Sequence, residues 1–576
     1  MKLLSLKLNG QYKGLKDQYF DFSRTQGNIV ALIGLNGSGK SQLLELVAEI
    51  FGYLERDLRK DYKCRNWFPS LAIEICYANQ PYDSEGQVNR YSVNINEHGI
   101  VTAYCDDILI DLGSDENSGI EEQILPSQVI GYSSGLNENL QRAFLKNTVQ
   151  FLDVMNVRRA WERRLSSINQ SRDERGKYLT EGDIDLIGEK FSEAYDYYQT
   201  RHPSIFPPLP QGSTIVDLTN IGLRATPLPR LKYFDQDTTT LMLASMGMLP
   251  GEVQLDIWQG KQRFNKIHSV KFRYDLRKFT YDTGALLDIA KLIDILADLS
   301  SCSFQPLPSV SKTSEEFFDQ FELDYLAGEL TIDFSDHRVR DVLESSFFTS
   351  QVLFEKLYRL HLLAADFWKG ETKRELRQDN FDGSAKRPQK WKSPINVLSL
   401  KLTDGHQYIE FDDLSDGEAQ LIQILSMAHI YKDSRALFLL DEPETHLNPS
   451  WRTYFHSFVE GVVGEDNEKG QLFISTHSPF MVSSLKREDV MLFERTDNGL
   501  IQMKPVDSQT YGASFEVLIK NHFGLRSLIS QTVVEAVKEF LPKDERPESL
   551  AAAREWIEEN LGDSMEKAYL LRKLQS

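Results

Sequence analysis

The chain has 576 residues, of which 41% are hydrophobic, so it is long enough for more than one domain with a sizeable core. Its formal net charge of −20 argues against a generally basic nucleic-acid-binding protein, although a local basic patch is compatible with it. The four cysteines form no Cys-x-x-Cys pair, so we expect neither a disulfide framework nor a zinc site, and a cytoplasmic location fits. No signal peptide and no membrane span is predicted, because no run of about 18 apolar residues occurs.

The first part of the chain, residues 1–139, has the pattern of an α/β fold. Leu4, Leu6 and Leu8 alternate with polar residues, which predicts a half-buried strand. An apolar run over 29–33 predicts a second strand, and leucines at helical spacing over 42–54 predict a helix. Further strands are expected over 71–77, 91–95 and 128–133. The glycine-rich segment between the second strand and the helix stands where a phosphate-binding loop would stand.

Residues 140–394 differ in pattern, and we interpret them as a large, mostly helical insertion that includes helices over 285–299 and 347–367. The α/β pattern resumes in a second lobe, 395–510, with strands near 396–402, 436–440 and 471–475. Residues 511–576 are predicted to form a helical tail. In this tail Leu550, Ala553, Ile557 and Leu561 fall on one helix face. No heptad run long enough for an extended coiled-coil arm is found.

The glycine-rich segment matches the pattern G-x-x-x-x-G-K-[ST] and predicts a site for ATP and Mg²⁺. Its glycines let backbone N–H groups surround phosphates, and the following helix N-terminus favours negative charge. Lys40 is expected to reach the β- and γ-phosphates, and the Ser41 hydroxyl is expected to bind Mg²⁺. The complete motif comprises Gly34, Leu35, Asn36, Gly37, Ser38, Gly39, Lys40 and Ser41.

Two acidic residues follow the apolar strand at 436–440, and a histidine follows the next one. Asp441 is predicted to hold Mg²⁺, and Glu442 to polarise the water that attacks the γ-phosphate. His477 is predicted to bond the γ-phosphate or that water. Parallel strands end at one edge of a sheet, so these side chains should meet the phosphate-binding loop there.

A third anion site is predicted where Leu-Ser-Asp-Gly-Glu, residues 414–418, precedes a helix over 419–430. Ser415 and Gly417 are the candidate contact residues, since a serine, a glycine and a helix N-terminus favour anions. Ser415 also has the properties of a simple helix N-cap, and the two roles are compatible.

Taken together, these motifs resemble the ABC-type ATPase heads of the SMC, RecF and OLD groups. The resemblance implies an α/β P-loop head, with a mixed sheet and an antiparallel lobe. It implies a homodimer of heads or a higher homo-oligomer, in which Ser415 and Gly417 contact the nucleotide of the partner. Asp416 departs from the family's usual glycine and adds a carboxylate near the phosphates.

A finer similarity, over 473–482, 493–495 and 510–515, is to the restriction-system-associated ATPases that overlap the PtuA subunits of Septu and some retron anti-phage systems. It implies that the ATPase scaffolds and restrains an effector. The partners so implied are an HNH nuclease and, in retrons, a reverse transcriptase with its RNA–DNA hybrid. A RecF-like DNA-binding repair ATPase and an OLD-like nuclease are the alternatives. The 99 residues after His477 lack the acidic cluster that an OLD nuclease needs.

Several smaller sequence features have more than one interpretation. Asn448 matches the family's D-loop but also a plain turn. The family's glutamine loop corresponds to Gln128, Ser134 or Asn137. The segments 158–164 and 386–392 mix basic and aromatic residues, as a nucleic-acid groove does, but a solvated charged face has the same composition.

Overall fold

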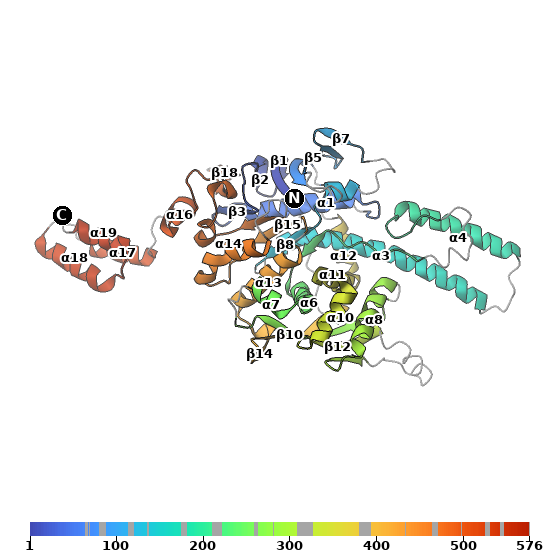
Figure 1. Ribbon diagram of the computed structural model, residues 1–576. Coiled ribbons are helices and arrows are strands. Elements are labelled where there is room, and N and C mark those ends of the chain that lie inside the picture. Colours follow the sequence, from blue (N-terminus) through green and yellow to red (C-terminus); the bar gives the residue numbers. More distant parts are fainter. Residues whose placement is uncertain are drawn as a thin grey trace. The chain divides into compact units, whose positions relative to one another are not determined.

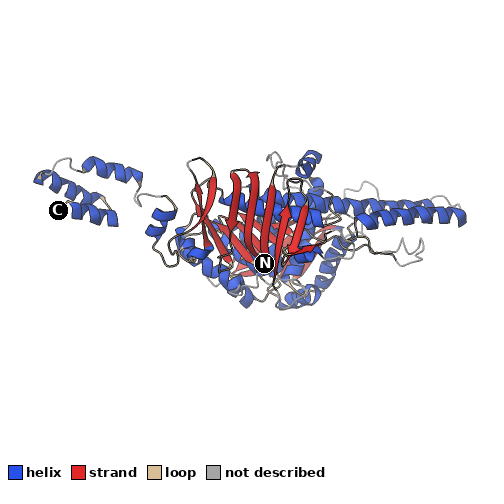
Figure 2. Cartoon of the chain, turned by 90° about the horizontal axis from the view of Figure 1, so that it is seen from above, coloured by secondary structure: helices blue, strands red, loops and turns tan. Residues whose placement is uncertain are grey.

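The computed structural model describes residues 1–63, 67, 70–79, 88–112, 120–134, 138–173, 181–209, 222–258, 263–279, 282–307, 326–378, 393–432, 434–463, 470–496, 498–524, 530–541 and 546–574. These residues form two compact units, Met1–Tyr511 and Gly512–Ser576. The first unit contains three sheets, which Figures 1 and 2 show with their flanking helices. No helix in the described ranges is long and apolar enough to cross a membrane.

The central sheet has seven strands in the order β18-β17-β3-β16-β15-β8-β9. All neighbours pair in parallel except β17 and β18, which are antiparallel. Apolar runs such as 29–33 are buried throughout, as parallel strands covered on both faces require. The strands span Ile29–Gly34 (β3), Val129–Ser133 (β8), Leu231–Tyr233 (β9), Leu437–Asp441 (β15), Gln471–Ser475 (β16), Val490–Arg495 (β17) and Ile501–Pro505 (β18).

An antiparallel sheet of six strands packs over helix α1 (Lys40–Leu58). Its order is β2-β1-β4-β5-β6-β7, so the whole sheet comes from the predicted N-terminal lobe. Residues of both sheets and of α1 share one hydrophobic core, which fixes the start of α1 relative to β3. The strands span Lys2–Tyr12 (β1), Leu15–Asp21 (β2), Ala72–Asn79 (β4), Asn89–Ile95 (β5), Val101–Cys105 (β6) and Ile108–Ile110 (β7).

The stretch 140–394 contains helices and also strands. Its strands build most of a third sheet, ordered β11-β12-β10-β13-β14. Sheet pairing does not follow the expected boundaries of the insertion: β13 lies after residue 394 and pairs with β10, whereas β9 lies inside the insertion and joins the central sheet. The strands span Lys266–Asp275 (β10), Cys302–Pro306 (β11), Ala327–Asp333 (β12), Ile395–Thr403 (β13) and Tyr408–Glu410 (β14).

The helices of this stretch include a long pair, α3 (Glu138–Asp173) and α4 (Glu181–Arg201), which run side by side (Figures 1 and 2). Trp161 of α3 packs against Phe191 and Tyr195 of α4, with ring centroids 4.6 and 5.5 Å away. Apolar side chains therefore hold the pair together at its base. The other helices span Gln236–Met246 (α6), Gly251–Ile257 (α7), Thr283–Ala297 (α8), His337–Phe347 (α10), Ser350–Leu362 (α11), Leu363–Phe367 (η2) and Gly370–Gln378 (α12).

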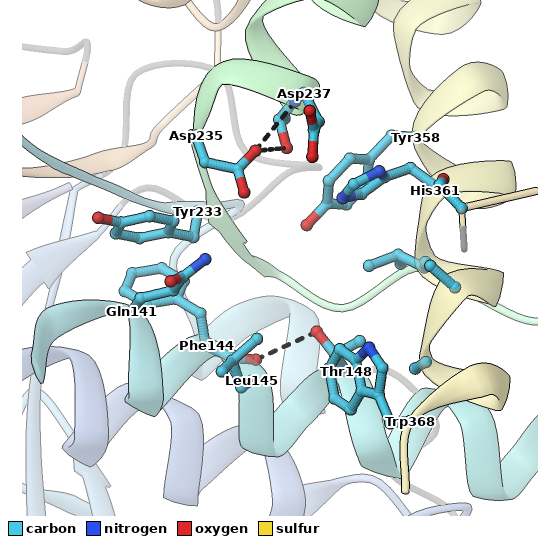
Figure 3. Close-up of a pocket in the computed structure, with 15 residues that line it drawn as sticks. Gln141, Phe144, Leu145, Thr148, Tyr233, Asp235, Asp237, Tyr358, His361 and Trp368 are labelled. Carbon is cyan, nitrogen blue, oxygen red and sulfur yellow. Dashed lines mark hydrogen bonds between the residues drawn. The ribbon is translucent and has the colours of Figure 1, made fainter. Parts of the chain in front are cut away.

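Helix α11 packs against the β9 side of the central sheet, where Phe354 stacks on Phe234 with ring centroids 5.6 Å apart. A cavity of about 90 Å³ lies between α3, β9 and α11, lined by Phe144, Tyr233 and Tyr358 among others (Figure 3). Asp235 caps α6 beside it by accepting a hydrogen bond from the Thr238 backbone at 3.0 Å. The cavity is small and bordered by rings, so it belongs to the packing of α11 against the core.

The remaining helices of the first unit span Ile120–Ile124 (α2), Phe411–Asp413 (η3), Asp416–Ile430 (α13), Pro449–Val463 (α14), Pro479–Val482 (α15) and Arg487–Asp489 (η4). The second unit consists of α16 (Phe515–His522), α17 (Gln531–Phe540), α18 (Pro547–Asn560) and α19 (Met565–Lys573). Ala553 and Ile557 are buried on one face of α18, and Phe540 of α17 stacks on Trp556 at 4.4 Å.

Candidate nucleotide-binding site

The phosphate-binding loop connects β3 to α1 and depends on glycines at three positions. Gly34, Gly37 and Gly39 all have positive φ angles, of 141°, 74° and 99°. A side chain at Gly34 would also collide with the carbonyl oxygen of Phe493 on the neighbouring strand. The loop therefore takes a conformation that other residues adopt only with strain.

Lys40 is the first residue of α1, and its ammonium group lies inside the loop. Its Nζ donates to the carbonyl oxygens of Gly34 and Leu35 at 3.1 and 3.2 Å, and lies 3.0 Å from Nε2 of His477. Only 4% of the residue is exposed. Burial lowers the pKa of Lys40 to about 8, against the opposing effect of nearby carboxylates, chiefly Glu442. The lysine is thus still mostly protonated at neutral pH.

Ser41 and Asp441 meet although they are 400 residues apart in the chain. The Ser41 Oγ donates to Asp441 Oδ1 at 2.8 Å, and the Ser475 hydroxyl donates to the same carboxylate oxygen. The register explains this meeting, because Asp441 ends β15 directly opposite Ser475, and β16 pairs with β3 on its other side. A hydroxyl and a carboxylate at this spacing are the hard oxygen ligands that Mg²⁺ prefers.

Glu442 and His477 face each other just beyond their strands, one residue after β15 and two residues after β16. Glu442 has a positive φ of 51° and its backbone N–H donates to Ser475 O at 3.0 Å. This turn directs the carboxylate outward, where its side chain is 41% exposed and Oε1 lies 3.4 Å from His477 Nε2. A strained, exposed carboxylate beside the phosphate loop is well placed to orient a water molecule.

The imidazole of His477 is neutral at physiological pH. Burial, and then the charge of Lys40, lower the pKa of His477 to about 4. Since the Lys40 ammonium donates to Nε2, the proton of the neutral ring resides on Nδ1. The ring therefore accepts at Nε2 and lies between the lysine and Glu442.

Two further side chains of the site were not assigned a role from the sequence. Glu444 is fully buried and accepts a hydrogen bond from the Thr476 hydroxyl, and burial raises the pKa of Glu444 to about 7. Arg495, at the end of β17, donates from Nε and Nη2 to Gly37 O at 3.2 and 3.1 Å. In the sequence Arg495 stood out only as part of the segment 493–495 that carries a family similarity, and that similarity gave it no role.

The Ser415 loop lies at the N-terminus of α13 and forms a capping box. The Glu418 backbone donates to Ser415 Oγ at 3.4 Å, and the Ser415 backbone donates to Glu418 Oε2 at 3.1 Å. The Ser415 hydroxyl bonds Glu418 as well, whereas its carbonyl oxygen accepts from the Ala419 backbone at 3.0 Å. Ser415 and Asp416 are exposed, so the loop presents them outward.

The packing around residue 417 explains why it is a glycine. It is buried, and a Cβ there would lie 2.7 Å from the carbonyl oxygen of His446, in the turn after Glu444. Leu414, Asp416 and Gln420 line one side of a cavity of about 410 Å³ whose other side includes Tyr132 and Ser134. The loop and the end of β8 therefore share one surface.

The structure places the smaller sequence features in different parts of the fold. Gln128 lies at the start of β8, at the opposite edge of the sheet from Asp441, and accepts from Lys232. Ser134 lies at the site: its backbone donates to Asp441 O at 3.0 Å and its hydroxyl to Thr445 at 2.9 Å. Asn448 accepts from the Trp451 backbone at 2.8 Å, as a helix cap does. Asn137 and the segment 386–392 lie outside the described residues.

The arginine-rich stretch of α3 is not an open groove at its first half. Arg158 is 2% exposed and donates to the carbonyl oxygen of Arg224 at 2.9 Å, and Trp161 is 1% exposed in the core between α3 and α4. Only Arg163 and Arg164 are exposed. The aromatic residue that suggested base stacking is therefore part of the packing.

Comparison with known proteins finds one matching family model and a set of similar solved structures. The family model described as "AAA domain, putative AbiEii toxin, Type IV TA system" matches residues 292–483. No curated protein matches the chain. The SMC head domain from Thermotoga maritima is 11% identical, with a TM-score of 0.31, over 88% of this chain and all of that one.

Two other solved structures have comparable similarity. The SMC head with a coiled coil from Pyrococcus yayanosii is 12% identical, with a TM-score of 0.31, over 91% of this chain and 100% of that one. RecF in the RecFOR pathway is 11% identical, with a TM-score of 0.28, over 87% and 97%. The chain is thus similar to the AAA family model over residues 292–483, and its phosphate-binding loop, acidic strand end and histidine together form a candidate nucleotide-binding site.

Proposed function

We propose that the chain binds ATP with Mg²⁺ and hydrolyses it in sites shared between two copies of itself. The observation that carries the proposal is the convergence of Lys40, Ser41, Asp441, Glu442 and His477 at one sheet edge. These groups come from the ends of neighbouring strands, which is where α/β folds bind nucleotides.

Each side chain has a role that fits its environment. The Gly34–Ser41 loop and Lys40 hold the phosphates, and in doing so Lys40 exchanges its carbonyl partners for phosphate oxygens. Ser41 and Asp441 are the residues that would hold Mg²⁺, which supplies charge neutralisation when bound. Glu442 orients the attacking water, and neutral His477 accepts or donates a hydrogen bond beside it.

The shared character of the site is supported by the exposure of Ser415. Its loop has no bond to the phosphate loop of its own chain among its recorded contacts, and it presents a serine and a helix N-terminus to the outside. A helix N-terminus favours anions, and inside its own chain this one is bonded by the Glu418 carboxylate. A second copy, related by a two-fold axis, supplies a phosphate anion at each of two equal sites.

A mixing experiment tests the shared site. Lys40→Ala removes the phosphate contact, and Ser415→Arg blocks the loop, so each purified variant should be inactive. When they are mixed, the mixed dimer has one intact site and one doubly damaged site, and roughly a quarter of the wild-type ATPase rate should return. If the mixture stays inactive although native mass spectrometry shows mixed dimers, the shared site is wrong.

We further propose that ATP turnover regulates a partner effector in anti-phage defence, in the manner of a PtuA subunit of Septu or a retron. The supports are the resemblance of 473–482 and 510–515 and the matched model, whose description names a toxin of a type IV toxin–antitoxin system. The effector expected is an HNH nuclease. A reverse transcriptase with its RNA–DNA hybrid is expected only in the retron form.

Co-purification from the native host, followed by mass spectrometry, tests the partner. Recovery of a nuclease that leaves the complex when Glu442→Gln replaces the wild type would support regulation by turnover. Tight, salt-sensitive DNA binding by the pure chain, with no partner, would favour the RecF-like repair ATPase instead. Metal-dependent DNA cleavage by the pure chain would favour the OLD-like nuclease.

A further inference from the structure

A further cavity, of about 500 Å³, lies at the amino-terminal edge of the central sheet, opposite the candidate nucleotide site. Gln128 at the start of β8, Lys232 on β9 and Arg59 at the end of α1 line one side. Helix α11 lines the other side. The cavity is therefore bordered both by the central sheet with α1 and by a helix of the insertion.

The lining of this cavity has an excess of positive charge. Five basic residues line it against three acidic ones, which leaves a formal excess of two. The basic residues are Arg59, Arg230, Lys232, Lys356 and Arg359, and the acidic ones are Glu121, Glu122 and Glu355. Three of the cations are at least nine-tenths buried: Lys232 is 1% exposed, Arg59 5% and Arg359 9%. Buried cations need anionic or hydrogen-bonding partners.

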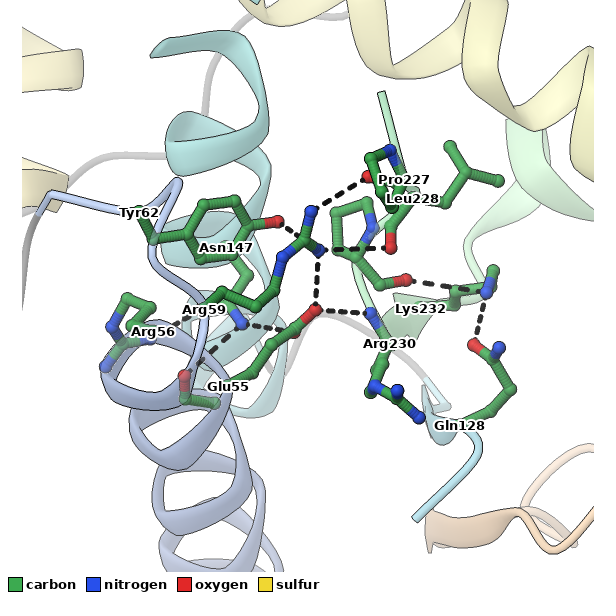
Figure 4. Close-up of polar contacts among 12 residues, drawn as sticks. Glu55, Arg56, Arg59, Tyr62, Gln128, Asn147, Pro227, Leu228, Arg230 and Lys232 are labelled. Carbon is green, nitrogen blue, oxygen red and sulfur yellow. Dashed lines mark hydrogen bonds and ion pairs between the residues drawn. The ribbon is translucent and has the colours of Figure 1, made fainter. Parts of the chain in front are cut away.

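Two of these cations are already held in place (Figure 4). Arg59 donates to Glu55 at 3.1 Å and to the Tyr62 hydroxyl at 3.0 Å, and it also reaches the carbonyl oxygens of 227 and 228. Lys232 donates to Gln128 and lies 3.8 Å from Glu355. These contacts fix the positions of both cations, and Glu55 and Glu355 partly offset their charges.

Donors without partners complete the cavity. Arg359 donates from Nη2 to Thr226 O at 2.6 Å, but its buried Nη1 has no hydrogen-bond partner among the described residues. The buried hydroxyl of Ser127 also lacks one there. A buried guanidinium N–H without an acceptor is costly and rare in folded proteins. In addition, Gln351 and Val352, in the first turn of α11, line the cavity and bring a helix N-terminus to it, where the Thr349 hydroxyl caps the Val352 N–H at 3.2 Å.

We propose that this cavity binds a phosphate-bearing small molecule about the size of a mononucleotide. A guanidinium group, a serine hydroxyl and a helix N-terminus are the donors that proteins use for phosphate. The volume falls within the range of small-ligand sites, roughly 300 to 1,000 Å³. The ligand would supply the acceptors that Arg359 Nη1 and Ser127 Oγ lack.

The cavity is connected to the nucleotide site by two rigid elements. Helix α1 runs from Lys40 to Leu58 and spans about 28 Å, and Arg59 follows it directly. Strand β8 runs from the cavity to Ser134, whose backbone donates to Asp441 O at 3.0 Å. Occupancy of the cavity should therefore change the ATPase rate. This coupling rests on the proposed function, whereas the binding site itself does not.

Isothermal titration calorimetry of the full-length Lys40→Ala variant tests the site, because this background removes phosphate binding at the loop. The probes are inorganic phosphate, pyrophosphate and AMP. We expect at least one to bind with a Kd below 1 mM, equivalent to about −4 kcal/mol or better. Adding Arg359→Met should weaken binding by about tenfold or more, and Ser127→Ala by about threefold. Binding of AMP but not of inorganic phosphate would identify a nucleotide as the ligand.

Arg338→Met is the matched control, because Arg338 is 57% exposed and pairs with Asp336 at 2.8 Å away from the cavity. It should leave the affinity unchanged. If circular dichroism shows that Arg359→Met does not fold, Ser127→Ala with Lys356→Gln decides the question. Absence of binding by all three probes at millimolar concentration, or equal affinity in the cavity variants, overturns the proposal. ATP hydrolysis by the wild-type chain is measured separately, so failure here leaves the proposed function intact.

Discussion

The two edges of the central sheet present buried lysines in opposite ways. At the carboxyl edge, Lys40 is 4% exposed and its partners are two carbonyl oxygens and a histidine, all of which a phosphate can replace. At the amino edge, Lys232 is 1% exposed, and Gln128 and a carbonyl oxygen hold it in place. The first lysine begins a helix and has exchangeable partners in the preceding loop, whereas the second lies within a strand.

The difference between the two lysines separates residues of the candidate site from residues that hold the sheet together. At the carboxyl edge the parallel strands end, so substitution of residues such as Asp441 and His477 leaves the strand pairing intact. At the amino edge, chain segments enter the sheet, and polar side chains there satisfy the backbone of the incoming segments. A test of this comparison should therefore separate loss of activity from loss of stability.

The largest effect is expected from Glu442→Gln at the carboxyl edge. The amide keeps the shape but cannot act as a base, so the hydrolysis rate should fall by about 100-fold or more while ATP affinity stays within a few fold. Steady-state phosphate release and nucleotide titration measure the two quantities. Glu460→Gln, on the exposed face of α14, is the control. Hydrolysis at the wild-type rate by Glu442→Gln would disprove the assigned role.

The comparison of the two lysines is tested by changing each to methionine. Lys40→Met should weaken ATP binding by about 100-fold and leave the melting temperature nearly unchanged, because its removal relieves burial of a charge. Lys232→Met should leave ATP affinity unchanged but destabilise the fold by about 1–3 kcal/mol, since Gln128 loses its partner. Calorimetry and nucleotide titration of both variants decide this. If Lys40→Met destabilised the fold and Lys232→Met weakened ATP binding, the comparison would be wrong.

His477 should act as a neutral group. We expect His477→Gln to lower the hydrolysis rate by roughly 10- to 100-fold. Because the pKa of His477 is about 4, the wild-type pH–rate profile should show no inflection near pH 6.5 from this residue. Rates measured from pH 5.5 to 9 (about the range the fold should tolerate) test this. An inflection near pH 6.5 that disappears in His477→Gln would show that the ring is charged.

A smaller effect is expected from Arg495→Ala. The guanidinium donates twice to Gly37 O and so restrains the phosphate loop, without touching the other catalytic groups that the structure brings together. The KM for ATP should rise by about three- to tenfold with little change in kcat. Arg487→Ala is a control, because Arg487 is also exposed and contacts Glu488 at 2.9 Å. Equal KM values for the wild type and Arg495→Ala would remove this role.

The smallest effect concerns stability and pH. Burial raises the pKa of Glu444 to about 7, above its value in an unfolded chain, so the folded state binds more protons. Glu444 therefore costs stability as the pH rises from about 4.5 to 7, and most above pH 7. Glu444→Gln should raise the melting temperature at pH 8 by about 2 °C relative to wild type and by less at pH 5. The opposite trend would show an ionised, well-partnered carboxylate.

Much of the carboxyl edge could be predicted from the sequence. The glycine loop, Asp441-Glu442 and His477 each follow an apolar run, and a strand followed by a polar turn places them at a known edge. Arg495 and Glu444 could not be given roles in this way. Their importance depends on which strand lies beside β3 and which side chain lies under the turn, and neither follows from local pattern.

The insertion was less predictable for a physical reason. Its sheet is formed by strands far apart in the chain, since β10 pairs with β12 on one side and with β13 on the other. Hydrophobic periodicity gives the type of an element but not its partner. The helices α3 and α4 lack a regular heptad, so their pairing through Trp161 was also not visible.

The candidate site at the carboxyl edge could be recognised from the sequence, because a phosphate-binding loop and an acidic strand end need particular residues at short, fixed spacings. The contacts of Gln128, Gly417 and Arg359 follow only from the packing of the fold. Gln128 holds a buried lysine, Gly417 leaves room for a neighbouring carbonyl oxygen, and Arg359 Nη1 has no hydrogen-bond partner among the described residues. Gln128 and Arg359 contact residues more than a hundred positions away in the chain, and Gly417 lies against His446, which is 29 positions away. Only packing brings these residues together.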